Sequence, residues 1–290
     1  MTIPARVKRS AGRYALVDGI PFRLPVDSSD TPALMAAFTI DADRAAGMLP
    51  GNELHPVRLP GGRGLLVITV VDYQTTDIGK YIEFSIALAC MRGSRPLPLP
   101  LALALGRVGQ FVLDLPVSSE VSVKGGKGIW GMPKHQAYLE FEITKKHVAS
   151  RYYLDGELAV SIEVKRPWFV GLPVAAAAAN YCQFRGMLMK SNIHFRGRGG
   201  LRPPFTRSAR LEISDHPRVA PLKTLEPGEK PLFSAFFPET RGTLDDHFES
   251  WFLSYDEPPS TQPEGLESVA DLGLSEEWLP RRARALEAQR

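Results

Sequence analysis

Lys134 is the residue of this sequence with the clearest chemical potential, and it directly follows Gly131-Met132-Pro133. A lysine amine attacks a ketone to form a Schiff base, but only in its neutral form. At an ordinary pKa of about 10.4, well under about 0.1% of an amine is neutral near neutral pH. Apolar neighbours such as Trp130 and Met132 disfavour the ammonium, and lowering the pKa by about 4 units costs roughly 5–6 kcal/mol. We therefore predict that Lys134 is a nucleophile for a carbonyl substrate.

The glycines before Lys134 match another motif. Gly126-Lys-Gly128-Ile-Trp-Gly131 fits the G-x-G-x-x-G pattern of dinucleotide-binding loops, which requires a helix directly afterwards to hold the pyrophosphate. Here Pro133 and an alternating run from Ala137 follow and predict a strand, and residues 120–124 before the motif also look like a strand. We interpret the glycines as a turn that lets the backbone pass close to a neighbouring group.

Other catalytic and binding motifs are weak. The six histidines are scattered at positions 55, 135, 147, 194, 216 and 247 without the spacing of a metal site, and the sequence lacks a G-x-S-x-G elbow. Asp215-His216-Pro217 predicts a turn. Arginines 185, 196, 198, 202, 207 and 210 form a mild basic cluster around Gly197–Gly200. We interpret the cluster as a solvated loop or an oligomer interface, with an anion-binding lid and an RNA-contacting loop as alternatives.

Composition is that of an ordinary globular protein. The 290 residues are 44% hydrophobic, and the formal net charge of +3 gives no reason to expect nucleic acid or a membrane as partner. Cys90 and Cys182 lie far apart and suit a reducing compartment. The N-terminal residues lack the apolar core of a signal peptide, and the apolar stretch of residues 98–105 is too short to cross a bilayer. We expect a cytoplasmic protein.

Residue patterns predict many strands. The 25 prolines are spread along the chain and favour short segments broken by turns. Ile82, Phe84, Ile86 and Leu88 alternate with Tyr81, Glu83, Ser85 and Ala87, and similar runs start at Ala137 and Leu158. Asp155-Gly156 predicts a hairpin turn, and residues 65–71 predict a buried strand. The class is therefore β-rich α+β, with a mostly antiparallel sheet over residues 33–215.

Few helices are expected. Residues 42–48 predict a short helix, and Thr243 with Phe248, Trp251 and Phe252 predicts a capped amphipathic helix. After Tyr255 the composition changes to DEPPSTQPEG and then to a charged tail. We predict one domain over residues 1–255, followed by a linker and tail over residues 256–290.

The segment Gly126-Lys-Gly-Ile-Trp-Gly-Met-Pro-Lys134-His-Gln-Ala resembles the active-site segment of the acetoacetate decarboxylase family, which ends in Pro-Lys with the nucleophilic lysine. An activated lysine in that enzyme is an established example of this chemistry. Gly79-Lys-Tyr81-Ile-Glu83 is similar to the family's Gly-x-Tyr-x-Glu strand. Further similarities follow in the same order at residues 39–50, at Asn180-Tyr181 and at residues 215–222. The resemblance covers about residues 20–255.

The resemblance implies a single domain with a partly closed antiparallel barrel and a few short helices, a homo-oligomer, and a reaction without any cofactor or metal. It implies that Lys134 forms an imine with a β-keto acid, so that carbon dioxide leaves while the imine accepts electrons. It makes Glu83 the acid, base or orienting carboxylate. The residues expected to bind substrate are Arg23, Trp130, Met132, His135 and Tyr81.

Three positions depart from the family pattern. The lysine that follows the nucleophile is replaced by His135, the glutamate of the Gly-Arg-Glu step is replaced by Gly128, and a second active-site carboxylate falls on Ile68. A histidine is mostly neutral near neutral pH, so desolvation has to lower the pKa of Lys134. These departures indicate imine chemistry on a different substrate, or a fold that has lost catalysis.

Our leading hypothesis is a lyase that decarboxylates a keto acid through Lys134. Aldol-type cleavage, condensation or dehydration is the runner-up, because the same iminium supports all of them. Two further hypotheses are a small-molecule-binding β-barrel without catalysis, and a nucleic-acid-binding barrel that uses the arginine cluster.

Overall fold

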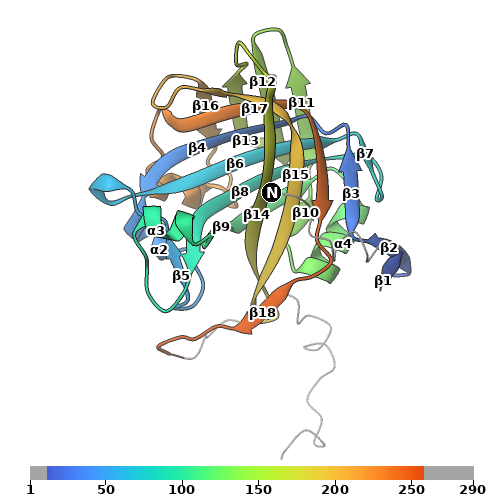
Figure 1. Ribbon diagram of the computed structural model, residues 1–290, viewed down its shortest axis with the longest axis horizontal. Helices are drawn as coiled ribbons and strands as arrows, with labels where there is room; N and C mark the ends of the chain where they lie inside the picture. The colour runs from blue at the N-terminus through green and yellow to red at the C-terminus, as the bar shows by residue number, and fades with distance from the viewer. Residues whose placement is uncertain (1–11, 258–290) are drawn as a thin grey trace, which may run out of the picture.

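A closed barrel dominates the computed structural model, which describes residues 12–257 (Figure 1). Seven strands follow one another around it in the order β14-β9-β8-β6-β4-β17-β15, and pairing of β15 with β14 closes the ring. These strands are β4 (Ala33–Asp41), β6 (Arg63–Tyr73), β8 (Tyr81–Arg92), β9 (Val108–Val117), β14 (Leu172–Phe184), β15 (Met187–Arg202) and β17 (Pro231–Leu244). All pairings in the ring are antiparallel except β9 with β14. The predicted β-rich fold is confirmed.

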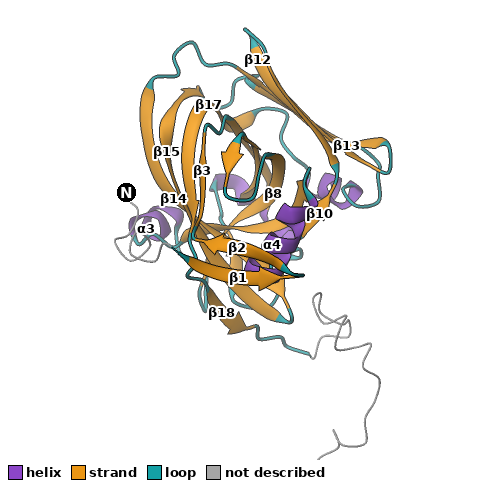
Figure 2. Cartoon of the chain, turned by 90° about the vertical axis from the view of Figure 1, so that its right-hand side faces the viewer, coloured by secondary structure: helices purple, strands orange, loops and turns teal. Residues whose placement is uncertain are grey.

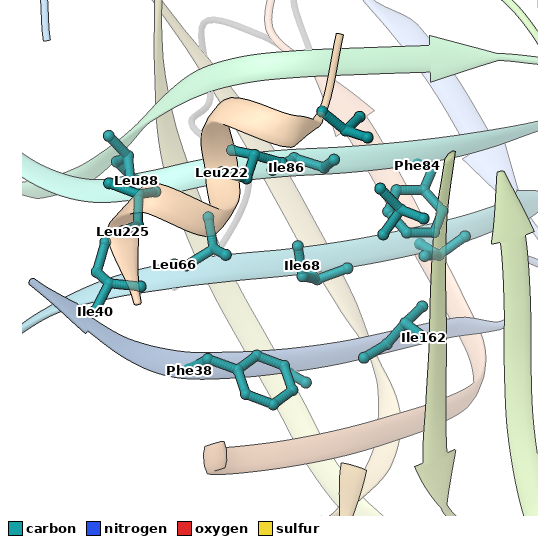
Figure 3. Close-up of a cluster of buried hydrophobic side chains, with 14 of the residues drawn as sticks. Phe38, Ile40, Leu66, Ile68, Phe84, Ile86, Leu88, Ile162, Leu222 and Leu225 are labelled. Carbon is teal, nitrogen blue, oxygen red and sulfur yellow. The ribbon is translucent and has the colours of Figure 1, made fainter. Parts of the chain in front are cut away.

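A second sheet covers part of the outer surface of the barrel. It contains β11 (Tyr138–Ile143), β12 (His147–Leu154), β13 (Glu157–Lys165) and β16 (Ala209–Ile213), all antiparallel. The turn between β12 and β13 is the predicted Asp155-Gly156 hairpin, and both residues have the positive φ that this turn requires. The largest hydrophobic core lies between this sheet and the barrel, and includes Phe38, Ile68, Phe84 and Ile162 (Figure 3).

Shorter elements complete the fold. The strands are β1 (Arg13–Val17), β2 (Ile20–Leu24), β3 (Val26–Ser29), β5 (Leu54–Pro56), β7 (Thr75–Thr76), β10 (Lys134–Gln136) and β18 (Glu249–Phe252). The helices are α2 (Ala42–Ala46), α3 (Leu99–Ala104), α4 (Glu120–Trp130) and the 3₁₀ turns η1 (Pro60–Gly62) and η2 (Ala220–Leu225). Helix α4 lies against the β1–β2 hairpin (Figure 2). No helix in residues 12–257 is long and apolar enough to cross a membrane.

The alternation along β8 divides its side chains between two environments, as predicted. Phe84, Ile86 and Leu88 point outward into the core beneath the second sheet. Tyr81 and Glu83 point into the barrel. This arrangement follows from the period of two in a strand, and it decides which residues of β8 meet a ligand.

The prediction of a helix after Thr243 is wrong. Strand β17 continues through Leu244, and Glu249–Phe252 forms β18, which pairs with residues 187–190 of β15. Asp245 is fully buried, and its backbone oxygen accepts a 3.0 Å hydrogen bond from Trp130 Nε1. The pairing with β15 and this buried contact prevail over a local pattern of aromatic residues. The shorter helix α2 was predicted correctly, and Asp41 caps it.

The arginine cluster was interpreted as a solvated loop or an oligomer interface, but its central members Arg196, Arg198 and Arg202 belong to the long strand β15. Its glycines allow close packing rather than flexibility. A Cβ on Gly197 would lie 2.9 Å from Thr240 Cα, and one on Gly200 would lie 2.7 Å from Pro167 Cβ. Arg196 and Arg198 are exposed. The predicted C-terminal tail lies outside the described residues, apart from Asp256 and Glu257.

Candidate active site

A cavity of about 190 Å³ occupies the inside of the barrel. Its wall is mostly apolar and is formed by the barrel strands together with α4. Among the described residues that line it, Lys134 and Glu83 are the charged ones. The fold therefore brings together the two residues predicted to be catalytic, Lys134 and Glu83.

The side chain of Lys134 is almost completely buried, with 4% of the residue exposed. Its Nζ lies 2.7 Å from Oε2 of Glu83 and donates a 2.9 Å hydrogen bond to Oγ of Ser122. The ammonium also lies 5.4 Å from the ring centre of Tyr81, within the range of a cation–π interaction. The amine is thus held by three groups and points into the cavity.

The end of α4 positions Lys134. Gly131 closes the helix in the left-handed conformation, with φ 63°, and its N–H bonds the Lys127 carbonyl, a common helix ending. The chain then turns through Met132 and enters β10 at Lys134. There it pairs in parallel with β9, with Lys134 opposite Leu115. The lysine therefore stands at the junction of a helix end and a strand.

The glycine-rich segment is a helix, not the turn between strands that we predicted. Ser122, Gly125 and Gly126 are spaced at i, i+3 and i+4, so they share the helix face that lines the cavity. A Cβ on Gly126 would lie 2.8 Å from Cε of Lys134. Gly126 thus provides space for the lysine. Ser122 was missed, because residues 120–124 had been interpreted as a strand, whereas helical periodicity would have placed it beside Gly126.

Electrostatics at Lys134 differ from the prediction. Burial acts to lower the pKa of Lys134, but the adjacent Glu83 carboxylate and Tyr81 outweigh it, so the pKa lies above its ordinary value. The expectation of a lowered pKa in the free protein is therefore wrong. The buried ammonium is retained because a partly buried counter-ion lies beside it. The amine becomes nucleophilic only when its proton moves elsewhere.

Two stacked tyrosines form the wall next to this ion pair. The rings of Tyr73 and Tyr81 lie 4.6 Å apart, and both residues are buried. Burial raises the pKa of Tyr81 to about 12, and burial together with the charge of Glu83 raises the pKa of Tyr73 well above its usual range. Both hydroxyls therefore remain protonated beside the Glu83 carboxylate.

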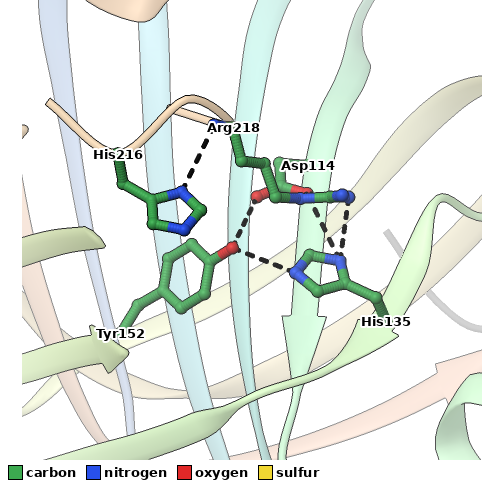
Figure 4. A network of polar contacts seen from close by, with 5 residues as sticks. All are labelled: Asp114, His135, Tyr152, His216 and Arg218. Carbon is green, nitrogen blue, oxygen red and sulfur yellow. Dashed lines mark hydrogen bonds and ion pairs between the residues drawn. The ribbon is translucent and has the colours of Figure 1, made fainter. Parts of the chain in front are cut away.

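His135 lies on the opposite face of β10 from the cavity. Its Nε2 is 3.0 Å from the Tyr152 hydroxyl, and its Nδ1 is 3.0 Å from Nη2 of Arg218 (Figure 4). Arg218 also donates to Oδ1 of Asp114 over 2.8 Å, and Tyr152 donates to Oδ2 of Asp114 over 3.3 Å. His135 thus belongs to a closed polar network outside the barrel and makes no contact with the cavity.

The remaining residues predicted to bind substrate are divided. Tyr81, Trp130 and Met132 line the cavity, whereas Arg23 is exposed and its neighbour Phe22 lines the cavity instead. On β6, Ile68 is buried in the core outside the barrel, and Thr69 faces inward. A carboxylate at position 68 would therefore not reach Lys134.

Comparison with known proteins identifies the family. A model of the family described as "Acetoacetate decarboxylase (ADC)" matches residues 8–167, which is more than half of the chain. No curated protein matches the sequence.

Solved structures share this fold at low sequence identity. Acetoacetate decarboxylase from Legionella pneumophila is 13% identical, with a TM-score of 0.56 over 82% of this chain and 88% of that one. Another acetoacetate decarboxylase structure has 13% identity and a TM-score of 0.59 over 81% and 92% of the two chains. The enduracididine biosynthesis enzyme MppR, complexed with pyruvate, has 17% identity and a TM-score of 0.57 over 78% and 90%. The family match and the shared fold agree, and the chain belongs to the acetoacetate decarboxylase family.

Proposed function

We propose that this protein is a lyase that forms a Schiff base between Lys134 and the ketone group of a small keto acid. The observation that carries this proposal is a buried lysine amine that points into an apolar cavity, with its Nζ 2.7 Å from the Glu83 carboxylate. An enclosed amine with an adjacent proton acceptor is the arrangement that imine formation requires.

Glu83 can accept the proton that the Lys134 ammonium must lose before it reacts. When a ketone enters, the Glu83 carboxylate takes one proton from Lys134, and the neutral amine adds to the carbonyl carbon. A second proton then passes from the nitrogen to the carbonyl oxygen, which gives the carbinolamine. Glu83 gives its proton to the carbinolamine hydroxyl, so water leaves and a protonated imine remains. The iminium keeps one positive charge beside Glu83, as the ammonium did, so imine formation leaves the Glu83 carboxylate paired.

Decarboxylation of a β-keto acid is the first reaction that we assign to this imine. The electron pair of the bond to the carboxylate moves into the iminium, which releases carbon dioxide and leaves a neutral enamine. A proton from water is added to the enamine carbon, and a second water molecule hydrolyses the iminium, which frees the ketone product and Lys134. The family match and the similar acetoacetate decarboxylase structures support this assignment.

Aldol-type chemistry is the second candidate, because loss of a proton from the same iminium gives an enamine that can add to an aldehyde. Glu83, 2.7 Å from the Lys134 amine, is placed to accept that proton. A similar structure, MppR, is complexed with the condensation product of pyruvate and imidazole 4-carboxaldehyde, so the fold houses a condensation product.

Reductive trapping tests the proposal. The protein is incubated with a panel of β- and α-keto acids and simple ketones, reduced with borohydride, and analysed by mass spectrometry of peptides. We expect an adduct on Lys134 that is absent in Lys134→Ala. A purely binding barrel would give no adduct with any member of the panel, and an adduct at another lysine would overturn the assignment of the nucleophile.

A further inference from the structure

The cavity has a second polar end that the imine chemistry does not use. Gln110 of β9 and Asn180 of β14 both line it at the point where these strands pair in parallel. Nε2 of Gln110 donates a 2.7 Å hydrogen bond to Oδ1 of Asn180. A single bond between two amides leaves further donors and acceptors on each of them. The pair can therefore bind a polar group of a ligand.

This amide pair lies well away from Lys134. The strand partner of Lys134 is Leu115, and Gln110 lies five residues earlier on β9. A bulge in β9, where Ile86 pairs with Asp114 and Ala87 with Val112, takes up one of these residues. At about 3.3 Å for each of the remaining four, roughly 13 Å of strand separates the two positions. The wall between them carries the apolar residues Val112 and Leu115. A keto acid of only a few carbon atoms, attached to Lys134, leaves the amides unused.

The charge of the lining restricts what the distant end of a ligand can be. Both amides are neutral, and the described lining residues with charge, Lys134 and Glu83, pair with each other at the other end. A carboxylate or an ammonium placed beside Gln110 would lose its hydration without meeting an opposite charge. A carboxamide, a hydroxyl or a second ketone would exchange water for hydrogen bonds with the amides.

We propose that Gln110 and Asn180 form a subsite for an uncharged hydrogen-bonding group, so that the substrate is a carbonyl compound with an apolar body and a neutral polar end. This inference rests on the proposed function, because it takes the carbonyl group to be bound at Lys134. It deepens that function by naming the class of molecule: longer than the smallest keto acids, and uncharged at the end remote from the amine.

Matched ketones test the subsite. The probes are straight-chain methyl ketones of one length that end in a carboxamide, a methyl group or a carboxylate, with acetone as the reference. Each is trapped on Lys134 with cyanoborohydride at limiting concentration, and its yield is divided by that of acetone for the same variant. In the wild type we expect about tenfold more adduct with the carboxamide than with the methyl end, from one or two additional hydrogen bonds.

Variants of the amide pair give the decisive comparison. Gln110→Leu/Asn180→Leu should remove the preference for the carboxamide, and Gln110→Lys should reverse the order in favour of the carboxylate. An unchanged preference in the double variant, or a carboxylate that wins in the wild type, would overturn the subsite.

A separate measurement distinguishes failure of the subsite from failure of the imine. If no ketone, acetone included, is trapped at Lys134, the proposed function fails. The subsite is then tested by thermal shift in Lys134→Met with the carboxamide-ended ketone. Stabilisation that disappears when Gln110→Leu/Asn180→Leu is added supports the subsite, and absence of stabilisation overturns it.

Discussion

Lys134 and His135 are consecutive residues of β10 whose side chains lie on opposite faces of the strand. Lys134 reaches Glu83 in the cavity, whereas His135 joins Asp114, Tyr152 and Arg218 outside the barrel. The nucleophile is thus fixed from both sides of a short strand. His135 does not line the cavity, so it acts on Lys134 through the placement of β10.

The polar network should make stability depend on pH through His135. Arg218 donates to Nδ1 of His135, so the ring is neutral and donates from Nε2 to Tyr152. Burial lowers the pKa of His135 below its ordinary 6.5, with Asp114 opposing and Arg218 reinforcing the shift. Because the pKa of His135 is lower in the folded protein, its contribution to the free energy of unfolding is complete above pH 6.5. That contribution is lost as the pH falls from there through the folded-state pKa.

Urea unfolding at a series of pH values checks this expectation. His135→Gln should flatten the fall in the free energy of unfolding below the ordinary histidine pKa. Tyr152→Phe is the comparison variant, because it removes a hydroxyl from the network but keeps the titrating ring. It should lower stability yet keep a dependence on pH. An identical slope in His135→Gln and the wild type would exclude the histidine as its source.

Removal of the amine should destabilise the fold through Glu83. In Lys134→Met the partly buried Glu83 loses its partner, and we expect a loss of about 3 kcal/mol, the lower end of the cost of breaking a buried pair. Adding Glu83→Gln should recover much of that loss, because the uncompensated charge disappears. Chemical unfolding of the two single variants and the double variant gives the coupling energy. Additive losses would mean that the two side chains are not coupled as the 2.7 Å contact implies.

Glu83→Gln should change the pH dependence of Lys134 reactivity. In the wild type the carboxylate outweighs burial and raises the pKa of Lys134, so labelling should increase only at alkaline pH. Without the carboxylate, burial dominates and lowers the pKa, which should move the labelling profile to lower pH. Acylation by a small reactive ester, followed by mass spectrometry, measures this profile. Turnover should nevertheless fall by orders of magnitude, because the proton acceptor is lost. A profile that moves upward would contradict the assignment.

Gly126→Ala should impair imine formation although alanine favours helices. The new Cβ would lie 2.8 Å from Cε of Lys134 and displace the amine. Gly128→Ala is the matched control on the same helix, since its Cβ meets the partly exposed side chain of Val17 at the surface hairpin. We expect trapping to fall at least tenfold in Gly126→Ala and to stay within about twofold of the wild type in Gly128→Ala. Similar values for both variants would argue against a role for Gly126 in placing the lysine.

A carboxylate introduced on β6 should report which face of the strand meets the cavity. Ile68→Glu places a charge in the core beneath the second sheet, and we expect a loss of about 4 kcal/mol or more. Thr69→Glu, one residue further, faces the cavity and should be tolerated better. Thr69→Gln controls for volume. Thermal unfolding ranks the three variants, and equal losses at positions 68 and 69 would be inconsistent with this register.

Local patterns determined much of this protein from sequence alone. Alternation along residues 81–88 placed Glu83 and Tyr81 on the face away from Phe84 and Ile86, because neighbouring residues in a strand point to opposite sides. The Pro133-Lys134 step and its surroundings indicated the family that the comparisons then identified. These inferences hold because each depends on only a few residues adjacent in the chain.

Tertiary structure decided the rest, because the interactions concerned join distant segments. The helical conformation of residues 120–130 brought Ser122 and Gly126 against Lys134, and pairing with β15 made a strand of the segment expected to be a helix. The pKa of Lys134 is raised, not lowered as predicted, for the same reason. Apolar neighbours in the sequence favour a neutral amine, but a carboxylate from β8, brought to 2.7 Å by the fold, retains the proton.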